Sequence, residues 1–176
     1  MARARIFLAN PTARDQKPFI AAAQASRRLH RPWISAPATA ERYRAYLAKA
    51  RQPNTAAFLV RRRADNAIAG VINLNEIVRG LFQSAYLGYY AFSPWAGHGY
   101  MTEGMRAALR EAFTVLKLHR LEANIQPDNT ASRLLVERCG FRCEGFSPRY
   151  LKIGGRWRDH ERWAILAEDW RRGPKG

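Results

Sequence analysis

Cysteine is scarce in this chain, with only Cys139 and Cys143 among 176 residues. Two cysteines are too few for a disulfide framework. They also lack the histidine neighbours that would complete a zinc site, because His119 is distant and His160 stands alone. We therefore expect two reduced thiols near a helix-to-strand corner and no metal site.

Acidic residues are also scarce: 14 Asp and Glu oppose 30 Lys and Arg, which gives a formal net charge of +16. Such an excess favours an anionic partner, either RNA, a phosphorylated cofactor or both. The basic residues are dispersed in short groups, and none forms the long block that is typical of a nucleic-acid-binding tail. Each group is equally compatible with a solvated surface, and for residues 61–63 we favour the end of a strand.

Long hydrophobic runs are absent, since no apolar segment approaches the roughly 20 residues that a membrane span requires. The segment 1–11 contains no apolar core of a signal peptide. Hydrophobic residues make up 47% of the chain, which excludes a disordered polycation. No Ser-, Gly- or Pro-rich linker divides the sequence, and its length suits one domain of about 100–200 residues. We expect a single cytoplasmic domain over residues 1–176.

Helical and strand periodicities alternate along the chain, which predicts a mixed α+β fold. Three successive apolar strands separated by short turns indicate an antiparallel meander. Thr39 is a candidate N-cap, and Gly140 suits the left-handed position that follows a helix. The expected helices are 21–29, 39–50, 100–117 and 131–139. The expected strands are 3–9, 57–60, 67–72, 85–92 and 118–125, with a terminal hairpin of 150–153 and 156–157 continued by 163–166.

The most informative local motif is the segment 97–102, Gly-His-Gly-Tyr-Met-Thr, between an expected strand and a long helix. Glycines in such a loop let successive backbone N–H groups approach an oxyanion without obstruction by a Cβ atom. The positive end of the helix dipole adds to this attraction, so the segment suits a phosphate or pyrophosphate; an ordinary glycine turn has the same spacing. Thr102 replaces the third glycine of the dinucleotide fingerprint, and antiparallel strands precede the loop, which excludes a dinucleotide-binding fold.

Several motifs resemble one acetyltransferase superfamily. Segment 91–103 resembles the acetyl-coenzyme A loop of the GNAT acetyltransferases, and segments 127–132 and 139–141 resemble the next block of that superfamily. A second set of segments is similar to the RimJ/RimL ribosomal-protein alanine N-acetyltransferases: 29–33, 73–80 and 150–160, the last two resembling the RimJ branch in particular. The resemblance covers nearly the whole chain and keeps the order of the motifs.

The resemblance implies a GNAT fold, in which a mixed, mostly antiparallel sheet splays at the cofactor site and carries helices on both faces. It implies acetyl-coenzyme A as co-substrate, with pantetheine between the strand ending at Ala91 and Phe92 and the strand at 121–123. Asn129 and Ser132 would approach the pantetheine arm and the thioester. Pro94 stands where many members have Gln or Arg, and we expect little loss because the phosphate contacts are mostly backbone. The pyrophosphate would bind the backbone N–H groups of Gly97, His98, Gly99, Tyr100, Met101 and Thr102.

Acetyl transfer to an amine needs a base for the ammonium proton and benefits from an acid for the departing thiolate. Glu122 matches the position of the base carboxylate in related N-terminal acetyltransferases, and a strand-edge ion pair is its alternative role. Glu76 is a second candidate base, whose alternative role is a solvated turn carboxylate. Val136 stands where many members have an acid tyrosine. Ser132 matches a serine of RimL-type enzymes, with helix capping as its alternative, and water can equally deliver the proton.

These expectations favour acetyl transfer to a protein N-terminal α-amine, and the resemblance implies the N-terminal alanine of a ribosomal protein as acceptor. An α-amine has a pKa of about 7.7–8.0 and keeps a useful neutral fraction near pH 7, whereas a lysine amine, near 10.4, needs a stronger base. One alternative is a small-amine acetyltransferase for polyamines or aminoglycosides, which the charge of +16 disfavours. Another is a non-catalytic module associated with RNA or the ribosome.

Overall fold

The computed structural model describes residues 4–172. Residue 3 of the expected first strand, and the ends 1–3 and 173–176 of the expected domain, lie outside the described residues. The strands are β1 (Ile6–Ala9), β2 (Ala56–Arg62), β3 (Ile68–Val78), β4 (Ser84–Ala91), β5 (Arg120–Ile125), β6 (Arg142–Ile153) and β7 (Arg156–Leu166).

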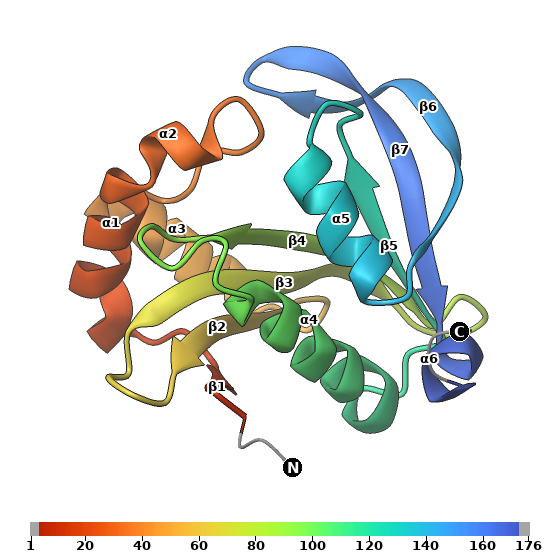
Figure 1. The fold of residues 1–176 in the computed structure, drawn as a ribbon, viewed down its shortest axis with the longest axis horizontal. Helices are drawn as coiled ribbons and strands as arrows, with labels where there is room; N and C mark the ends of the chain where they lie inside the picture. Colours follow the sequence, from red (N-terminus) through yellow and green to blue (C-terminus); the bar gives the residue numbers. More distant parts are fainter. Residues whose placement is uncertain (1–3, 173–176) are drawn as a thin grey trace.

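These strands form one sheet in the order β1-β2-β3-β4-β5-β7-β6 (Figure 1). β4 and β5 run parallel, while all the other neighbouring strands are antiparallel. The expected meander is therefore confirmed as β2, β3 and β4. The single parallel pair follows from the connection between β4 and β5, because a helix carries the chain back to the end of the sheet at which β4 began.

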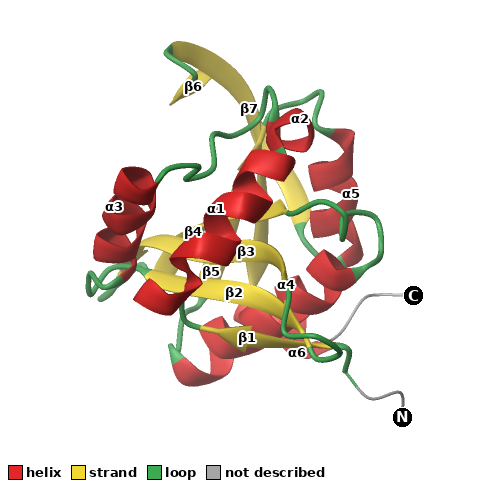
Figure 2. Cartoon of the chain, turned by 90° about the vertical axis from the view of Figure 1, so that its left-hand side faces the viewer, coloured by secondary structure: helices red, strands yellow, loops and turns green. Residues whose placement is uncertain are grey.

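Helices cover both faces of the sheet (Figures 1 and 2). One face carries α1 (Gln16–Ala25), α2 (Arg27–His30) and α3 (Ala40–Ala50). The other carries α4 (Tyr100–Arg110), its π-helical continuation η2 (Glu111–Val115) and α5 (Thr130–Arg138), while η1 (Ala13–Asp15) and α6 (Ala167–Arg172) are short. The buried side chains form two clusters, one including Phe19 and Tyr43, the other including Met105 and Leu109. Alternate residues of a strand pack into different clusters, because successive side chains point to opposite faces of the sheet. A mixed sheet with helices on both faces is an α+β architecture, which confirms the expected fold class.

The expected helix 21–29 is instead two helices, and the break falls at Ser26. The Ser26 hydroxyl is buried, donates to the Ala22 carbonyl at 2.7 Å and accepts from the Ser93 N–H at 2.9 Å. This hydrogen bond holds the break against the segment that follows β4. Local periodicity in the sequence cannot predict a contact between such distant residues. The expected helix 100–117 is also wrong in its second half, since the α-helix ends at Arg110 and a π-helical turn follows.

Two helix signals in the sequence are confirmed. The Thr39 hydroxyl accepts from the Arg42 N–H at 3.3 Å and caps α3. Gly140 follows α5 with φ +90°, a conformation that a β-carbon disfavours. The terminal hairpin is confirmed at its Gly154–Gly155 turn, but its strands are longer than expected, at 12 and 11 residues.

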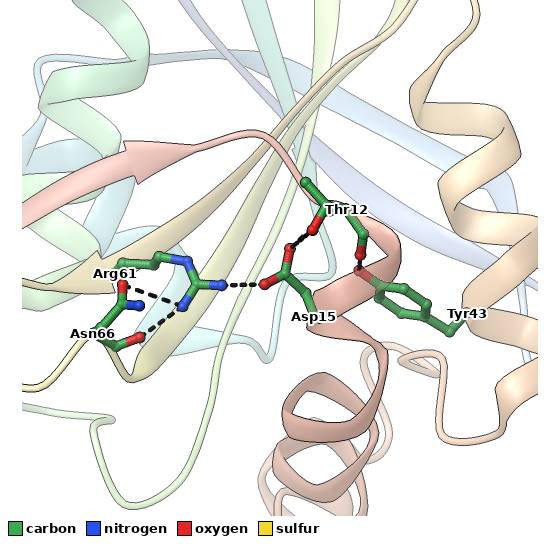
Figure 3. Close-up of polar contacts among 5 residues, drawn as sticks. All are labelled: Thr12, Asp15, Tyr43, Arg61 and Asn66. Atoms are coloured by element: carbon green, nitrogen blue, oxygen red, sulfur yellow. Dashed lines mark hydrogen bonds and ion pairs between the residues drawn. The ribbon is translucent and has the colours of Figure 1, made fainter.

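A buried polar network anchors the N-terminal part of the chain (Figure 3). Asp15 forms an ion pair with Arg61 of β2 and accepts from the Thr12 N–H and hydroxyl, both at 2.8 Å. The Tyr43 hydroxyl of α3 donates to the Thr12 carbonyl at 2.7 Å, and burial raises the pKa of Tyr43 to about 12. Arg61 also donates to the Asn66 carbonyl at 2.6 Å. Arg61 therefore has a structural role near the end of β2, which agrees with the interpretation of residues 61–63 as the end of a strand.

Candidate functional site

The central strands β4 and β5 diverge as the sequence predicts. They are paired only from Ser84 to Leu87 and from Arg120 to Ala123, although β4 continues to Ala91 and β5 to Ile125. A cavity of about 480 Å³ opens along the unpaired end of β4. Its walls come from the end of β4, the segment 95–102, α2 with the residues that follow it, and α5. The cavity thus joins the two blocks that carry the superfamily resemblance.

The glycine-rich loop lies at one end of this cavity. Gly97 and Gly99 have φ values of +81° and +82°, so both use a backbone conformation that side chains rarely adopt. Gly99 directly precedes α4, whose first N–H groups have no intrahelical partners. Gly97, Gly99, Met101 and Thr102 line the cavity. This end therefore offers backbone N–H donors and a helix dipole to an anionic group.

Residues outside the loop hold it in place. The Arg5 backbone N–H donates to Glu103 at 3.1 Å, its Nε donates to the same carboxylate at 2.6 Å, and its Nη2 donates to the His98 carbonyl at 3.1 Å. The His98 and Tyr100 rings stack on each other, with centroids 6.3 Å apart. Neither residue lines the cavity. The contacts expected of His98 and Tyr100 are backbone contacts and stay a prediction.

The α5 end of the cavity carries Asn129 and Ser132, as the sequence predicts. The Asn129 side chain accepts from the Ser132 N–H at 3.1 Å and therefore caps α5. The Ser132 hydroxyl instead lies 2.6 Å from the hydroxyl of Tyr89. The capping role that was the alternative for Ser132 thus belongs to Asn129. Val136, at the position of the acid tyrosine, is fully buried.

Tyr89 and His30 are cavity residues that sequence reasoning did not single out. Burial raises the pKa of Tyr89, while the hydrogen bond with Ser132 opposes that rise, so the phenol stays protonated at neutral pH. His30 Nε2 lies 2.8 Å from the Ala91 carbonyl, which can only accept, so Nε2 carries the proton. Burial lowers the pKa of His30 and keeps the ring neutral. The alternation of side chains along the expected strand 85–92 could have singled out Tyr89, because it places Tyr89 and Tyr90 on opposite faces of the sheet.

Besides His98 and Tyr100, three expected site residues do not line the cavity. The Phe92 side chain is fully buried among the aromatic residues beneath α1 and α3, and its N–H donates to the Ala69 carbonyl at 2.8 Å. Glu122 accepts from Arg120 Nε at 2.8 Å, and Arg120 also contacts Glu144. Glu76, at an irregularity in β3 with φ +50°, is exposed and accepts from Asn54 Nδ2 at 3.4 Å. The structure therefore does not bring Glu122 or Glu76 into the cavity with Ser132.

Metal and membrane features are absent from the part of the chain that the structure describes. Between residues 4 and 172, no group of three or more His, Cys, Asp or Glu side chains could hold a metal ion. Cys139 is buried and Cys143 is exposed, and neither forms a disulfide. No helix within this range is long and apolar enough to cross a membrane.

Residues 5–142 match the family described as the acetyltransferase (GNAT) domain, and the chain belongs to this family. Over 106 residues it is 42% identical to the [ribosomal protein uS5]-alanine N-acetyltransferase of Escherichia coli, a match that covers 60% of this chain. The same match spans 55% of that relative, which is slightly more than half of its length.

Two solved structures extend the comparison. Mycobacterium smegmatis RimJ in complex with CoA-disulfide superposes with a TM-score of 0.86 at 28% identity, covering 97% of this chain and 85% of that chain. The spermidine N-acetyltransferase of Vibrio cholerae in complex with CoA and spermine has a TM-score of 0.81 at 23% identity, covering 96% and 99%. The second comparison shows the fold alone, whereas the first also agrees with the RimJ-like motifs.

Proposed function

We propose that this protein transfers an acetyl group from acetyl-coenzyme A to the N-terminal α-amine of a protein. The N-terminal alanine of a ribosomal protein is the acceptor that we favour, because the Escherichia coli relative is named for that reaction on uS5. The observation that carries the proposal is the cavity along the unpaired end of β4, between the segment 95–102, α2 and α5. One end has backbone donors for an anion, and the other has the hydroxyl pair of Tyr89 and Ser132.

The residues of the cavity fit the coenzyme. The backbone N–H groups of 97–102 and the N-terminus of α4 face an anionic group, and the charge of +16 strengthens attraction to phosphates. The edge of β4 beyond Leu87 is not paired with β5 and can offer backbone groups to the amide groups of a pantetheine arm, apart from the Ala91 carbonyl, which accepts from His30 Nε2. Asn129 and Ser132 lie on the opposite wall. The RimJ structure from Mycobacterium smegmatis is a complex with CoA-disulfide, which supports binding of the coenzyme by this fold.

Acetyl-coenzyme A supplies the acetyl group as a thioester, and the reaction is direct attack by the neutral amine. A C–N bond forms and the C–S bond breaks, and the proton that the nitrogen loses after the attack balances the proton gained by the thiolate. The proton that the ammonium loses before the attack is released to the base. In this proposal Ser132 donates to the sulfur, and the Tyr89 hydroxyl, 2.6 Å from the Ser132 hydroxyl, supports it. Glu122, Glu76 or water then accepts the amine proton, and an α-amine needs only a modest base near pH 7.

The decisive experiment is an acetylation assay with acetyl-coenzyme A and a panel of acceptors: N-terminal peptides, spermidine and an aminoglycoside. We expect peptides to be acetylated on the α-amine, with the position fixed by mass spectrometry. Acetylation of spermidine alone would establish the small-amine alternative, which the charge disfavours because polycations are repelled. Coenzyme binding without any acetylation would establish the non-catalytic module.

We further propose that the basic surface of this protein contacts the RNA to which the acceptor protein is bound. The proposed location of the activity is the cytoplasm. Arginine contacts with phosphates release counterions, so association should depend steeply on salt. We expect co-sedimentation with ribosomes or RNA at low salt, lost within a few hundred millimolar salt, while acetylation of a free peptide declines much less. Absence of co-sedimentation at low salt would remove the ribosome from the proposal and leave the acetyltransferase intact.

A further inference from the structure

A second cavity, of about 210 Å³, lies beside the first, between α3, the residues after α2 and the sheet. Ile34 and Tyr90 line both cavities, so the two share a wall. Tyr90 follows Tyr89 in β4 but faces the other side of the sheet, toward α3, and it lines both cavities. A peptide in the larger cavity that passes this shared wall can reach the second cavity with its next residues, which span about 3.3–3.6 Å each.

Several polar side chains of this second cavity can donate hydrogen bonds. The Asn73 side-chain oxygen already accepts from the Tyr46 hydroxyl at 3.1 Å, which leaves the Asn73 Nδ2 group as a donor. Asn75 also lines the cavity, and its Nδ2 would lie 3.1 Å from a Cβ atom at Gly88, where β4 leaves β5. The Thr55 hydroxyl oxygen is buried and has no hydrogen-bond partner among the described residues. A buried polar atom of this kind is satisfied when a ligand binds to it.

The charges around the second cavity are positive. Lys49 lines it from α3, and Arg42 of the same helix donates to the Ser35 hydroxyl and carbonyl at 3.0 and 2.8 Å, which fixes another part of the wall. Glu76 does not line the cavity, and its carboxylate faces Asn54. Burial raises the pKa of Tyr46 and of Tyr90, so both phenols stay neutral and add no negative charge.

We propose that the second cavity is a specificity subsite that receives an oxygen-rich side chain, a carboxylate or carboxamide, from the second or third residue of the acceptor. This inference rests on the proposed acetylation of a protein N-terminus. A cavity with several hydrogen-bond donors and a lysine at its edge binds carboxylate and carboxamide oxygens and disfavours a cationic side chain. It also explains how a strongly basic enzyme selects peptides over polyamines, which have no oxygen atom to offer.

The experiment measures kcat/KM for peptides that begin with alanine and differ only at position 2 or 3, with Glu, Gln, Leu or Lys there. At one of these positions we expect Glu and Gln peptides to exceed the Leu peptide by about tenfold, because Leu leaves the Thr55 and Asn73 groups unpaired. Thr55→Val removes the buried hydroxyl while keeping its shape, and this variant should reduce the preference for Glu and Gln over Leu. Lys49→Glu should lower kcat/KM for the Glu peptide about fivefold and leave kcat/KM for the Leu peptide within about twofold of its original value.

Lys117→Glu is the matched control, because Lys117 is exposed, follows η2 and lines neither cavity. It changes the net charge by the same amount, so it should affect all peptides equally. Unchanged selectivity in both Lys49→Glu and Thr55→Val, with acetylation intact, would overturn the subsite and leave the proposed function standing. Failure of the unmodified protein to acetylate any of the peptides would overturn both.

Discussion

The hydroxyl oxygens of Tyr89 and Ser132 lie 2.6 Å apart and join β4 to α5 across the larger cavity. The two residues are 43 positions apart in the sequence and come from β4 and α5. Because burial holds the Tyr89 phenol in its protonated form, it can donate to Ser132 and leave the serine O–H directed toward the cavity. In the proposed mechanism Ser132 contacts the departing sulfur, and Tyr89 is a positioning residue for Ser132.

The first prediction follows from this pair. Ser132→Ala should lower kcat by about 100-fold if Ser132 protonates the thiolate, and Tyr89→Phe should lower kcat by about tenfold through loss of one hydrogen bond. Coenzyme affinity should change little in either variant. Because Tyr89 acts through Ser132, the double variant should be no slower than Ser132→Ala alone. Additive losses in the double variant, or an unchanged kcat in both single variants, would refute the arrangement.

The second prediction concerns coenzyme binding at Gly99. Gly99→Asp adds a β-carbon at a φ of +82° and a negative charge where the pyrophosphate would approach. We expect a loss of about 3 kcal/mol, or about 100-fold in Kd, measured by calorimetry. Gly80→Asp is the control, because Gly80 also has a positive φ, +68°, but lies in an exposed turn outside the cavity. Equal coenzyme affinity in a folded Gly99→Asp variant would remove the loop from the binding site.

The third prediction concerns the base. Glu122→Gln should lower kcat by about 10²–10⁴-fold with coenzyme affinity intact if this carboxylate accepts the amine proton. Its ion pair with Arg120 must then open or relay through water. A mild effect of Glu122→Gln together with a severe effect of Glu76→Gln would transfer the role to Glu76. The pH–rate profiles decide between them, and an acidic limb that survives in both variants would exclude both carboxylates.

The fourth prediction is a pH dependence of stability from His30. Burial lowers the pKa of His30 in the native protein, whereas in the unfolded chain the ordinary value is about 6.5. As the pH falls below about 6.5, the unfolded chain binds a proton that native His30 does not, so the free energy of unfolding decreases until the pH reaches the native pKa. Denaturant unfolding should show a smaller decrease in the free energy of unfolding from pH 7 to pH 5 for His30→Leu than for the unsubstituted protein. The same reduction in a variant of the exposed His98, His98→Leu, would contradict this assignment.

Sequence reasoning succeeded where the determining interactions are local. Thr39 caps the nearest helix, Gly140 ends one, and the glycines of 97–102 adopt positive φ values because the loop itself requires them. These features depend on residues within a few positions of one another. The antiparallel meander of β2, β3 and β4 also follows from patterning, because three apolar strands follow one another with short turns between them.

The features that the sequence did not predict depend on contacts between distant residues. The break at Ser26 depends on Ser93, 67 positions away, and Asp15 depends on Arg61, 46 positions away. The partnership of Tyr89 with Ser132 has the same character, as does the second cavity, which collects Lys49, Thr55 and Asn73 from three elements. The sequence left two roles open for Glu122, a catalytic base and a partner in an ion pair. Only the position of Arg120 in the structure shows that the ion pair is formed.

The positions of the tryptophans have a consequence for measurement. Of the five in the chain, Trp33 and Trp95 line the larger cavity, and the Arg62 guanidinium lies 3.6 Å from the centre of the Trp95 ring. Trp163 is buried in the core, and Trp157 is exposed on the hairpin. A ligand that fills the cavity therefore changes the surroundings of two indole rings and leaves those of Trp157 and Trp163 in place. The protein carries its own optical reporter, and intrinsic fluorescence can follow occupancy of the cavity without a label or a substitution.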